Sequence, residues 1–563
     1  MYFGTAIVPV TMPVWWPFCL STICYSFMHH TLLLVLGLLF AVLMLVMLAQ
    51  KAKVAYPIFL VIAGLVISFI PGLPRISLKP DLIFTIFLPP LLYEAAWYTS
   101  WKDFWKWKRP ISLLAFGLVF FTSLVVAYCA NSFIPGFTLA LGFLLGGIIS
   151  PPDAVAAATV LKGLKVPKRI LTILEGESLV NDASSLIVFR FALAAILTGS
   201  FSMQQATGQF FLVAGMGVVI GLAGAHIMYV IHRFLPTNAA TDAAFTVMTP
   251  YMLFLGAEQF HFSGVMAVVS GGLFISFRAH EVFRSGHSRM NMLGVWTTMI
   301  FIMNALVFIL IGLALPDVIE GLGDYSIKDA IIYGLIISAI AIVLRMLWVF
   351  PAAHLPRLLS SRIRKDPSPG WKGPLIISWA GMRGVVSLAT ALSIPLFMDD
   401  KVTPFPHRSL IIFITFVVIF VTLVFQGLTL PLIIKWTGIK EIDIIAPENE
   451  QQAGIRFNLN KVALQQINDH HNHHLDVNEF LRQLKAELEA DLQMTQQKLE
   501  TLGCNMDEHG RIQSFNHILL DLYHIQRQEL FRLRRENLFS DSEIRKAELQ
   551  LDLSEMKVTG ISH

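Results

Sequence analysis

The chain has 563 residues, of which 55% are hydrophobic and only 14% are charged. Soluble globular proteins carry about 25% charged residues, so this composition excludes an ordinary soluble domain and predicts a protein that crosses the membrane many times. The formal net charge of +4 is small, and no basic patch interleaved with aromatic residues indicates a nucleic-acid partner. The cysteines are scattered and indicate neither a disulfide framework nor a metal site; they are Cys19, Cys24, Cys129 and Cys504.

Residues 1–30 form an apolar segment that is interrupted by Pro9, Pro13 and Pro17. The segment lacks the basic start of a secretory signal. Two interpretations stay open, because the segment could lie at the membrane interface or the native chain could begin at Met28.

Apolar windows long enough to cross about 30 Å of hydrocarbon recur from Thr31 to residue 440. No window alternates with the period of a barrel strand, and backbone groups in lipid must be satisfied within the segment, so each window is predicted to be a helix. The predicted domain therefore holds about thirteen transmembrane helices. They lie near 31–50, 54–72, 81–99, 110–129, 136–161, 170–196, 208–234, 241–260, 263–278, 294–315, 326–351, 373–396 and 408–436.

The lysines and arginines alternate between the connections of these helices. Odd-numbered connections are basic, as in the run Lys102, Lys106, Lys108 and Arg109, and even-numbered ones are poor in basic residues. The positive-inside rule then predicts an N-terminus outside and a C-terminus in the cytoplasm. The main exceptions are Arg75, Lys79, Lys401 and Arg408. Short loops and a lean tail favour a bacterial inner membrane.

Residues 441–563 are charged and rich in helix-forming residues. Apolar positions recur three and four residues apart, as in amphipathic helices, which predicts a cytoplasmic helical tail with a regulatory role. A histidine cluster within it, His470, His471, His473 and His474, has the composition of a metal site or a pH sensor. A solvated linker between two helices is the favoured interpretation.

The stretch 174–189 lies in an apolar run and yet carries Glu175, Glu177, Asn181 and Asp182. An ionised carboxylate at bilayer depth costs roughly 2.5–3.5 kcal/mol on insertion scales, so it normally marks an ion path or a paired internal site. In a helix, Ser178 and Asp182 lie one turn apart.

A second interruption lies in 146–158, where Pro151 and Pro152 break a predicted helix in front of Asp153. Such a break in mid-membrane is tolerated where it is buried or lines a cavity, and freed carbonyls there can bind ions. The alternative is a kinked structural helix whose second half is capped by Asp153. The ion-site interpretation is favoured because Asp153 and Asp182, on neighbouring helices, suit a small hard cation that takes oxygen ligands.

A third interruption lies in 378–395, where the buried Arg383 stands between Gly381 and Gly384. Arginine does not deprotonate, so Arg383 and the equally apolar-flanked Arg345 are each expected to need a carboxylate. Glu175 and Glu177 are the candidates, with the pairing left open, and the role of these four residues is predicted to be structural. Two interrupted helices in separate halves of a chain are the pointer to an inverted-repeat transporter with its site near the midplane.

Four motifs, ISPPDAVA, EGESLVNDASSLIVF, GMRGVVSLA and FQGLTLPL, occur in this order and spacing. They resemble those of the monovalent cation/proton antiporter family one, which includes bacterial sodium/proton antiporters and animal sodium/hydrogen exchangers. The resemblance covers about residues 31–440 and implies an all-α fold with inverted repeats and two broken, crossing helices. It also implies that Asp182 binds sodium or protons in turn.

The resemblance assigns roles to further residues. Asn181 matches a neighbour that steadies the helix crossing by hydrogen bonds, Asp153 matches the acid at the first break, and Ser178 matches a hydroxyl beside the ion. The residues that match the buried ion pairs are Glu177 with Arg383, and Glu175 with Arg345. Glu94 matches an acid near the ion route in some members; a satisfied buried carboxyl is the alternative. Many members have Thr where this chain has Pro152, so Ser150 or a free carbonyl is expected to supply the missing oxygen.

The expected function is sodium/proton antiport by alternating access, without an enzymatic step and without a cofactor. Family members are dimers, and Asn before the binding acid goes with one-for-one, electroneutral exchange. Two alternatives stay open: a potassium/proton antiporter of the same fold, and a cation channel gated by the tail.

Overall fold

The structure of the chain is a computed structural model. It describes residues 16–70, 83–161, 164, 166–199, 203–283, 286–323, 325–359, 370–398, 402–439, 448–470, 478–501, 507–535, 544, 547 and 550–555. These residues are helical apart from short connections and one isolated bridge between Phe397 and Pro404. The chain divides into two compact units, Met1–Asp443 and Ile444–His563, and each is described by itself.

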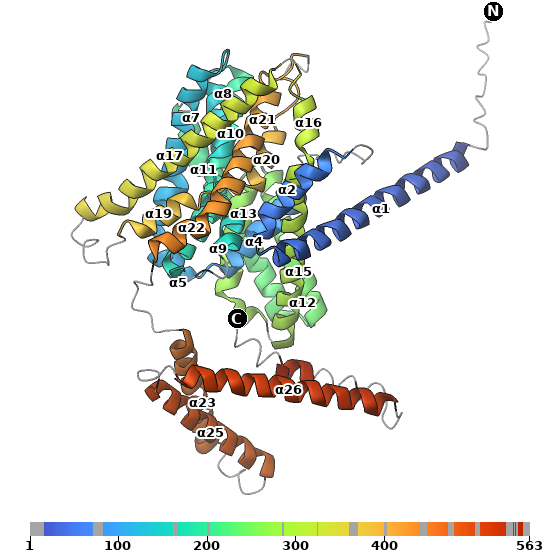
Figure 1. The fold of residues 1–563 in the computed structure, drawn as a ribbon, viewed down its shortest axis with the longest axis vertical. Coiled ribbons are helices and arrows are strands. Elements are labelled where there is room, and N and C mark those ends of the chain that lie inside the picture. Colours follow the sequence, from blue (N-terminus) through green and yellow to red (C-terminus); the bar gives the residue numbers. More distant parts are fainter. Residues whose placement is uncertain are drawn as a thin grey trace, which may run out of the picture. The chain divides into compact units, whose positions relative to one another are not determined.

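The first unit is a helical bundle (Figure 1). Its longer helices are α1 (Trp16–Lys51), α2 (Tyr56–Ser68), α4 (Leu88–Tyr98), α7 (Val119–Phe133), α8 (Leu139–Ile149), α10 (Lys168–Thr198), α11 (Met203–Phe234), α12 (Ala239–Gln259), α13 (Gly264–Phe277), α15 (Gly286–Leu313), α17 (Ile327–Leu359), α21 (Arg408–Val421) and α22 (Gly427–Thr437). The shorter α-helices are α5 (Trp101–Lys106), α6 (Lys108–Ser112), α9 (Ala154–Leu161), α14 (Ala279–Val282), α16 (Leu315–Glu320), α19 (Lys372–Trp379) and α20 (Val385–Leu392). Three π-helical turns join neighbouring helices: η1 (Ile83–Phe87), η2 (Leu113–Leu118) and η3 (Thr422–Gln426).

Every predicted membrane window contains helix. Among the described residues, eight helices are long and apolar enough to cross a membrane, and two shorter apolar helices are Tyr56–Ser68 and Gly264–Phe277. The all-α membrane fold is therefore confirmed, whereas the number of thirteen crossings stays a prediction.

The expected N-terminal segment 1–30 and the expected helix 31–50 share one helix in the structure. Helix α1 runs without a break from Trp16 to Lys51, while residues 1–15, with Pro9 and Pro13, lie outside the described part. Pro17 is the second residue of α1. The N–H groups of the first helical turn have no acceptor within the helix, so a proline is compatible with this position and does not break the helix.

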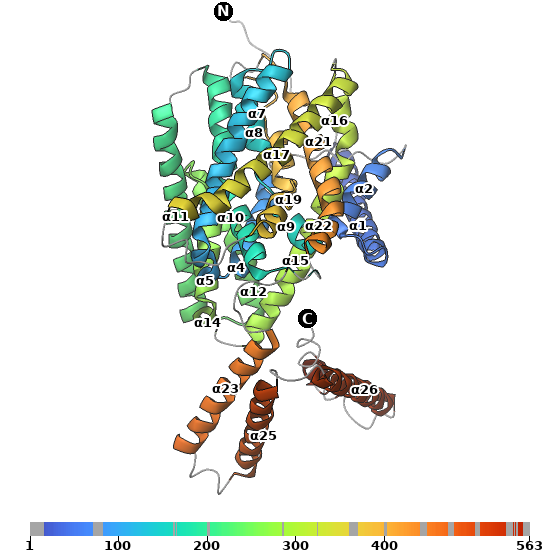
Figure 2. The same ribbon diagram turned by 60° about the vertical axis from the view of Figure 1, so that its left-hand side comes forward.

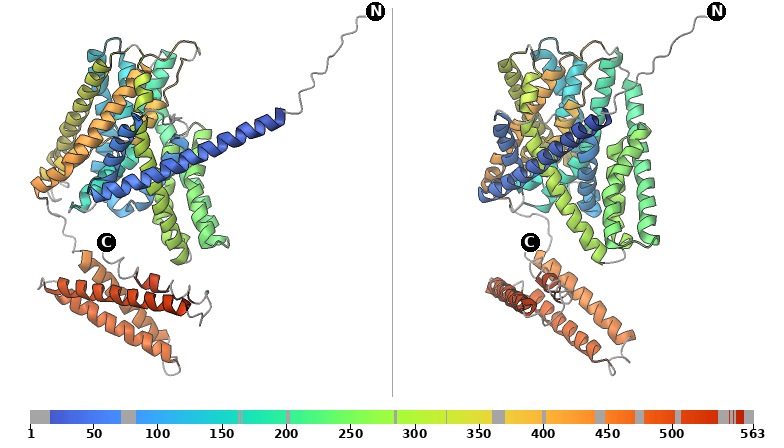
Figure 3. Two further views of the ribbon diagram at one scale, coloured as in Figure 1. Left: turned by 45° about the vertical axis from the view of Figure 1, so that its right-hand side comes forward. Right: turned by 90° about the vertical axis from the view of Figure 1, so that its right-hand side faces the viewer.

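Two hydrophobic cores hold the bundle together. The larger one joins α2, α7, α8, α17 and α21, whereas the smaller one joins α4, α11, α12 and α13. Helices α7, α8, α17 and α21 stand beside one another in Figures 1 and 2, and α11, α12 and α13 of the second group are among the green helices of Figure 3. Helix α10 belongs to both, because Leu174 packs in the larger core and Leu179 and Ala183 in the smaller one. The helix that carries Asp182 is thus held from two sides.

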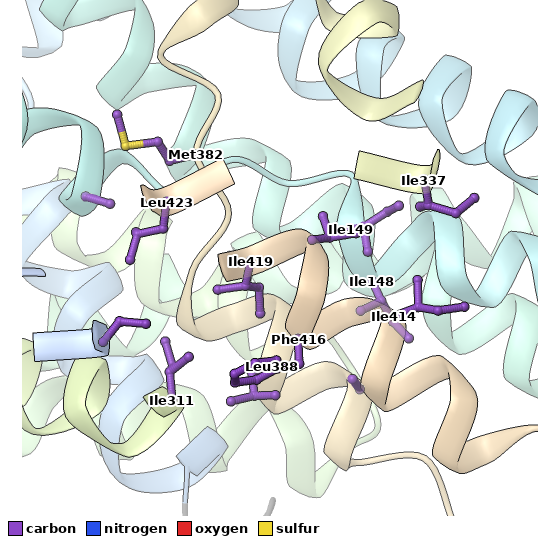
Figure 4. Close-up of a cluster of buried hydrophobic side chains, with 14 of the residues drawn as sticks. Ile148, Ile149, Ile311, Ile337, Met382, Leu388, Ile414, Phe416, Ile419 and Leu423 are labelled. Atoms are coloured by element: carbon purple, nitrogen blue, oxygen red, sulfur yellow. The ribbon is translucent and has the colours of Figure 1, made fainter. Parts of the chain in front are cut away.

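Two helices are interrupted in mid-course, as the sequence predicts. One breaks between α8 and α9 at Ser150–Asp153, the other between α19 and α20 at Ala380–Gly384. The breaks touch, since the Asp153 N–H donates to the Met382 carbonyl at 2.6 Å. Both broken helices pack on α21: Figure 4 shows Ile148 of α8 next to Ile414, and Leu388 of α20 next to Phe416.

The second unit is formed by α23 (Glu448–His470), α25 (Glu479–Thr501) and α26 (Asp507–Arg535). Arg456 of α23 and Asp491 of α25 form a bidentate ion pair, with N–O distances of 2.6 and 2.8 Å. His470 is the exposed last residue of α23, and His471, His473 and His474 lie outside the described residues.

Candidate ion-binding site

Asp182 lies near the middle of α10 and lines a cavity of about 320 Å³. The carboxylates of Asp153, Glu94 and Glu175 line the same cavity, as does Ser178. Asp182 is 6% exposed. No described arginine, lysine or histidine forms an ion pair with it. This carboxylate therefore remains available to a cation that enters the cavity.

Asp153 joins the two broken helices at their breaks. Its Oδ1 accepts hydrogen bonds from the N–H groups of Val155 at 2.8 Å and Ala156 at 3.3 Å, which caps the first turn of α9. The other carboxylate oxygen, Oδ2, lies against Gly384, directly before Val385, the first residue of α20. The sequence left helix cap and cavity wall as alternatives, and Asp153 does both.

Gly384 makes the close approach of the two breaks possible. A Cβ atom on Gly384 would overlap the carboxylate of Asp153. Any side chain at this position would therefore push the start of α20 away from Asp153 or displace the carboxylate itself.

Ser178 lies one turn before Asp182 and also contacts the first break. Its hydroxyl accepts a hydrogen bond from the Ala154 N–H at 3.3 Å. Ser178 thus links α10 to the start of α9, and its hydroxyl lines the cavity.

The two buried arginines have different partners. Arg345 of α17 forms a bidentate ion pair with Glu177, at 2.5 and 2.8 Å, and both side chains are fully buried. Arg383 donates instead to backbone carbonyls, to that of Ile149 at 2.9 Å and to that of Gly381. The expectation of a carboxylate for each arginine is therefore wrong for Arg383, because the broken helices free carbonyls that satisfy it.

Charges are matched to the ends of all four half-helices. The carbonyl ends of α8 and α19 face arginines, since Arg383 binds the Ile149 carbonyl and Arg345 binds the Ile377 carbonyl at 3.1 and 3.2 Å. The amide ends of α9 and α20 face the single carboxylate of Asp153. Helix ends carry partial charges of about half an elementary charge, positive at the amide end, so each of these contacts is favourable.

Glu175 is exposed and lines the cavity, so its predicted pairing with Arg345 is also wrong. Two residues along a helix turn the side chain by about 200°, and Glu177 alone faces α17. Glu94, on the last turns of α4, is half-buried and lines the same cavity. Both glutamates stand close in sequence to basic connections, Glu94 before Lys102 and Glu175 after Arg169.

The predicted hydrogen bonds of Asn181 are not formed among the described residues, and Ser150 is not among the described residues that line the cavity. Asn181 is fully buried, and neither atom of its amide has a hydrogen-bond partner there, so the predicted bonds across the crossing are not formed. The Ser150 hydroxyl donates to the Gly147 carbonyl at 3.2 Å within its own helix. Pro152 does line the cavity, beside Asp153.

Sequence reasoning missed several polar residues of the cavity: Tyr56, Thr159, Asn304 and Ser387. Asn304 is the clearest case, because it stands in the apolar run 299–313 of α15 and is 6% exposed. A buried amide in such a run was the signal that could have found it.

Residues 35–436 match the family described as "Sodium/hydrogen exchanger, transmembrane". A sodium, potassium, lithium and rubidium/H(+) antiporter of Bacillus pumilus is 35% identical over 387 residues, which are 67% of this chain and 57% of that protein. The Na(+)/H(+) antiporter ApNhaP of Aphanothece halophytica is 32% identical over 391 residues, covering 69% of this chain and 70% of that one.

The fold has a counterpart among solved structures. The sodium proton antiporter MjNhaP1 of Methanocaldococcus jannaschii superimposes with a TM-score of 0.56 over 70% of this chain and 99% of that one. At 21% sequence identity this likeness concerns the fold alone.

Proposed function

The chain belongs to the sodium/hydrogen exchanger family, and we propose that it is a sodium/proton antiporter whose binding carboxylate is Asp182. The matched region spans only 57% of the length of the Bacillus pumilus relative. The proposed activity is therefore assigned to the first unit of this chain, Met1–Asp443. The observation that carries the proposal is the contrast between three acids of one region. Glu177 is bound to Arg345 and Asp153 caps α9 beside the start of α20, whereas Asp182 lines the cavity with no ion-pair partner among the described residues.

Competition at this carboxylate supplies the coupling. Ionised Asp182 binds sodium with help from the Asp153 charge and the Ser178 hydroxyl, and protonated Asp182 does not. Each unit of pH changes the free energy of protonation by about 1.36 kcal/mol, a tenfold change in the occupancy ratio. The bare anion is too costly to carry through the membrane, so the site moves only when it is loaded with sodium or with protons.

Alternating access is proposed to arise from movement of the broken helices together with α10. Asp153, Ser178 and the Arg345–Glu177 pair tie α9, α10, α17 and α20 to one another, which lets them move as one body. We propose one-for-one exchange, so that the membrane potential, worth about 2.3 kcal/mol per charge per 100 mV, does no work on the cycle. Transport of this kind needs neither a chemical step nor a cofactor.

The decisive experiment measures proton flux in everted membrane vesicles or proteoliposomes after addition of sodium or potassium chloride. Wild-type protein is expected to dissipate an imposed pH gradient when sodium is added. Asp182→Asn is expected to be folded and inactive, because its amide can neither hold a proton reversibly nor pair with a cation. Exchange at the wild-type rate in Asp182→Asn would refute the proposal.

Potassium is the second candidate, because the Bacillus pumilus relative is described as an antiporter of sodium, potassium, lithium and rubidium. The same flux measurement with each salt separates the two. Equal rates with sodium and potassium would indicate a broad site of this kind.

We also propose the membrane, the oligomeric state and the orientation of the protein. We place the protein in a bacterial inner membrane as a homodimer, with its N-terminus outside and its C-terminus in the cytoplasm. The basic connections favour this orientation. Ile444–His563 would then be a cytoplasmic regulatory unit, and the cavity lined by Glu94 and Glu175 would open to the cytoplasm.

A further inference from the structure

A second cavity, of about 280 Å³, lies apart from the ion-binding cavity and shares no residue with it. Basic side chains from three different parts of the chain line it: Lys106, Lys108, Arg109, Arg169 and Arg357. None of the described residues that line it is acidic. The positive charges of Lys106, Lys108 and Arg109 repel one another around this hollow, so their arrangement is favourable when an anion is bound between them.

The cavity lies at the level where membrane helices end. Three of the membrane-crossing helices have the bounds Lys108–Phe133, Lys168–Thr198 and Ile327–Arg357. Lys108, Arg169 and Arg357 therefore stand at the ends of three different helices, beside one cavity. This is the depth of lipid phosphate groups, between the hydrocarbon and the water.

Aromatic rings hold three of the cations in place. The Lys108 ammonium lies 3.8 Å from the ring centre of Trp105, and the Arg169 guanidinium lies 4.2 Å from that of Trp107. The Lys106 ammonium also lies over Trp107, 5.0 Å from the centre of its ring. Contacts of this type restrict long side chains before a ligand arrives, which lowers the entropy lost on binding.

The rest of the wall is apolar. It is formed by side chains of the helices η2, α10, α17 and α19, among them Leu114, Ile173, Val349 and Ile377. A free inorganic anion gains nothing from such a wall, whereas a lipid can place its phosphate among the cations and the start of an acyl chain against the apolar side. We infer that this cavity binds the phosphate group of an anionic phospholipid.

Binding of phosphatidylglycerol to purified, delipidated full-length protein tests the inference by native mass spectrometry, without any transport measurement. Phosphatidylcholine and inorganic phosphate are the comparison ligands. Wild-type protein should prefer phosphatidylglycerol to phosphatidylcholine, and millimolar inorganic phosphate should not displace it. Displacement by inorganic phosphate would overturn the lipid assignment in favour of a free phosphate.

Two triple variants, each of which removes three positive charges, test whether the position of the charges matters. The triple variant Lys106→Gln, Lys108→Gln, Arg109→Gln should bind phosphatidylglycerol more weakly by about fivefold per charge, on the order of a hundredfold in all. The control triple Lys51→Gln, Lys53→Gln, Lys102→Gln removes three exposed charges from other positions in the basic connections and should bind like the wild type. Equal loss in both triples would overturn the site, as would full binding by the first.

A charge-retaining variant guards against misfolding. Lys106→Arg with Lys108→Arg keeps every positive charge, so it should keep phosphatidylglycerol binding and elute as the wild type does in size-exclusion chromatography. Loss of binding in this folded variant would contradict recognition by charge.

Discussion

Arg345 and Glu177 face each other across α17 and α10 with two hydrogen bonds, of 2.5 and 2.8 Å, and neither side chain is exposed. Arg345 also binds the Ile377 carbonyl at the end of α19, so the pair ties the second broken helix to the helix of Asp182. A Cβ atom on Gly381 would overlap the Arg345 side chain, which shows how closely the break is packed on the pair.

Removing one partner of this pair should destabilise the protein strongly. Glu177→Gln leaves the buried Arg345 guanidinium without a carboxylate, and Arg345→Met leaves the buried Glu177 carboxylate without a cation. An uncompensated buried charge typically costs about 3–5 kcal/mol. The double variant Glu177→Leu, Arg345→Met removes both charges and should recover part of the stability. Thermal unfolding in detergent, followed by the fluorescence of a thiol-reactive dye or of tryptophan, measures these differences in stability.

The exposed pair between Arg190 and Glu258 is the control for this prediction. In this pair Nη2 of Arg190 contacts both carboxylate oxygens of Glu258, at 2.8 and 2.9 Å, and the Arg190 side chain is 46% exposed. Arg190→Gln should therefore cost no more than about 1 kcal/mol. Similar losses at the buried and exposed pairs would contradict the role given to burial.

Gly384→Ala should abolish transport. The added methyl group would overlap the Asp153 carboxylate, so α20 cannot keep its contact with α9. Gly294→Ala is the matched control, because nothing lies within 4 Å of a Cβ at that position of α15. The comparison is made by sodium-dependent proton flux at equal protein amounts. A wild-type flux in Gly384→Ala would show that the two breaks do not need this approach.

Much of this arrangement could be predicted from the sequence because its signals are local. Apolar windows indicate the helices, Pro151 and Pro152 mark one break, and Asp182 stands out against an apolar run. The partners of buried charged side chains, in contrast, can lie far away in the sequence. The sequence could not tell that Arg383 is satisfied by carbonyls, because one of them, that of Ile149, is freed by a helix break 234 residues away in the chain.

The choice between Glu175 and Glu177 shows the same limit. Helical geometry tells that the two side chains diverge, but only the packing of α17 against α10 decides which one meets Arg345. Arg408, an exception to the charge alternation, also has a reason in three dimensions. Its guanidinium donates to the carbonyls of Ile394 and Leu392, at 2.8 and 3.2 Å, just past and at the end of α20.

Asp153→Asn should separate the capping role of this residue from its charge. Asparagine caps helices about as well as aspartate, so the variant should be nearly as stable as the wild type, while its sodium affinity should fall because one negative charge beside Asp182 is lost. Asp153→Ala should lose both the cap, worth about 1 kcal/mol, and the affinity. Ser263→Ala removes the cap of α13 away from the site and should lose stability alone. Unchanged sodium affinity in Asp153→Asn would limit this residue to the cap.

Neutralising the glutamates of the cavity should slow the entry of cations. Glu94→Gln with Glu175→Gln removes two negative charges from the cavity that leads to Asp182, so half-maximal transport should need several-fold more sodium at low ionic strength. The effect should shrink as salt is added, because the screening length falls from about 30 Å at 0.01 M to about 10 Å at 0.1 M. Asp329→Asn, on the first turn of α17 outside this cavity, is the control.

Acidity should weaken sodium transport by competition and not by loss of structure. Protons and sodium are proposed to share the Asp182 carboxylate, so once this group is mostly protonated, each further unit of acidification should raise the sodium concentration for half-maximal exchange tenfold. The maximal rate at saturating sodium should change much less, because enough sodium displaces the protons. Sodium titrations of proton flux at several pH values distinguish the two effects. A half-maximal concentration that stays constant while the maximal rate falls would place the proton at a second group, outside the sodium site.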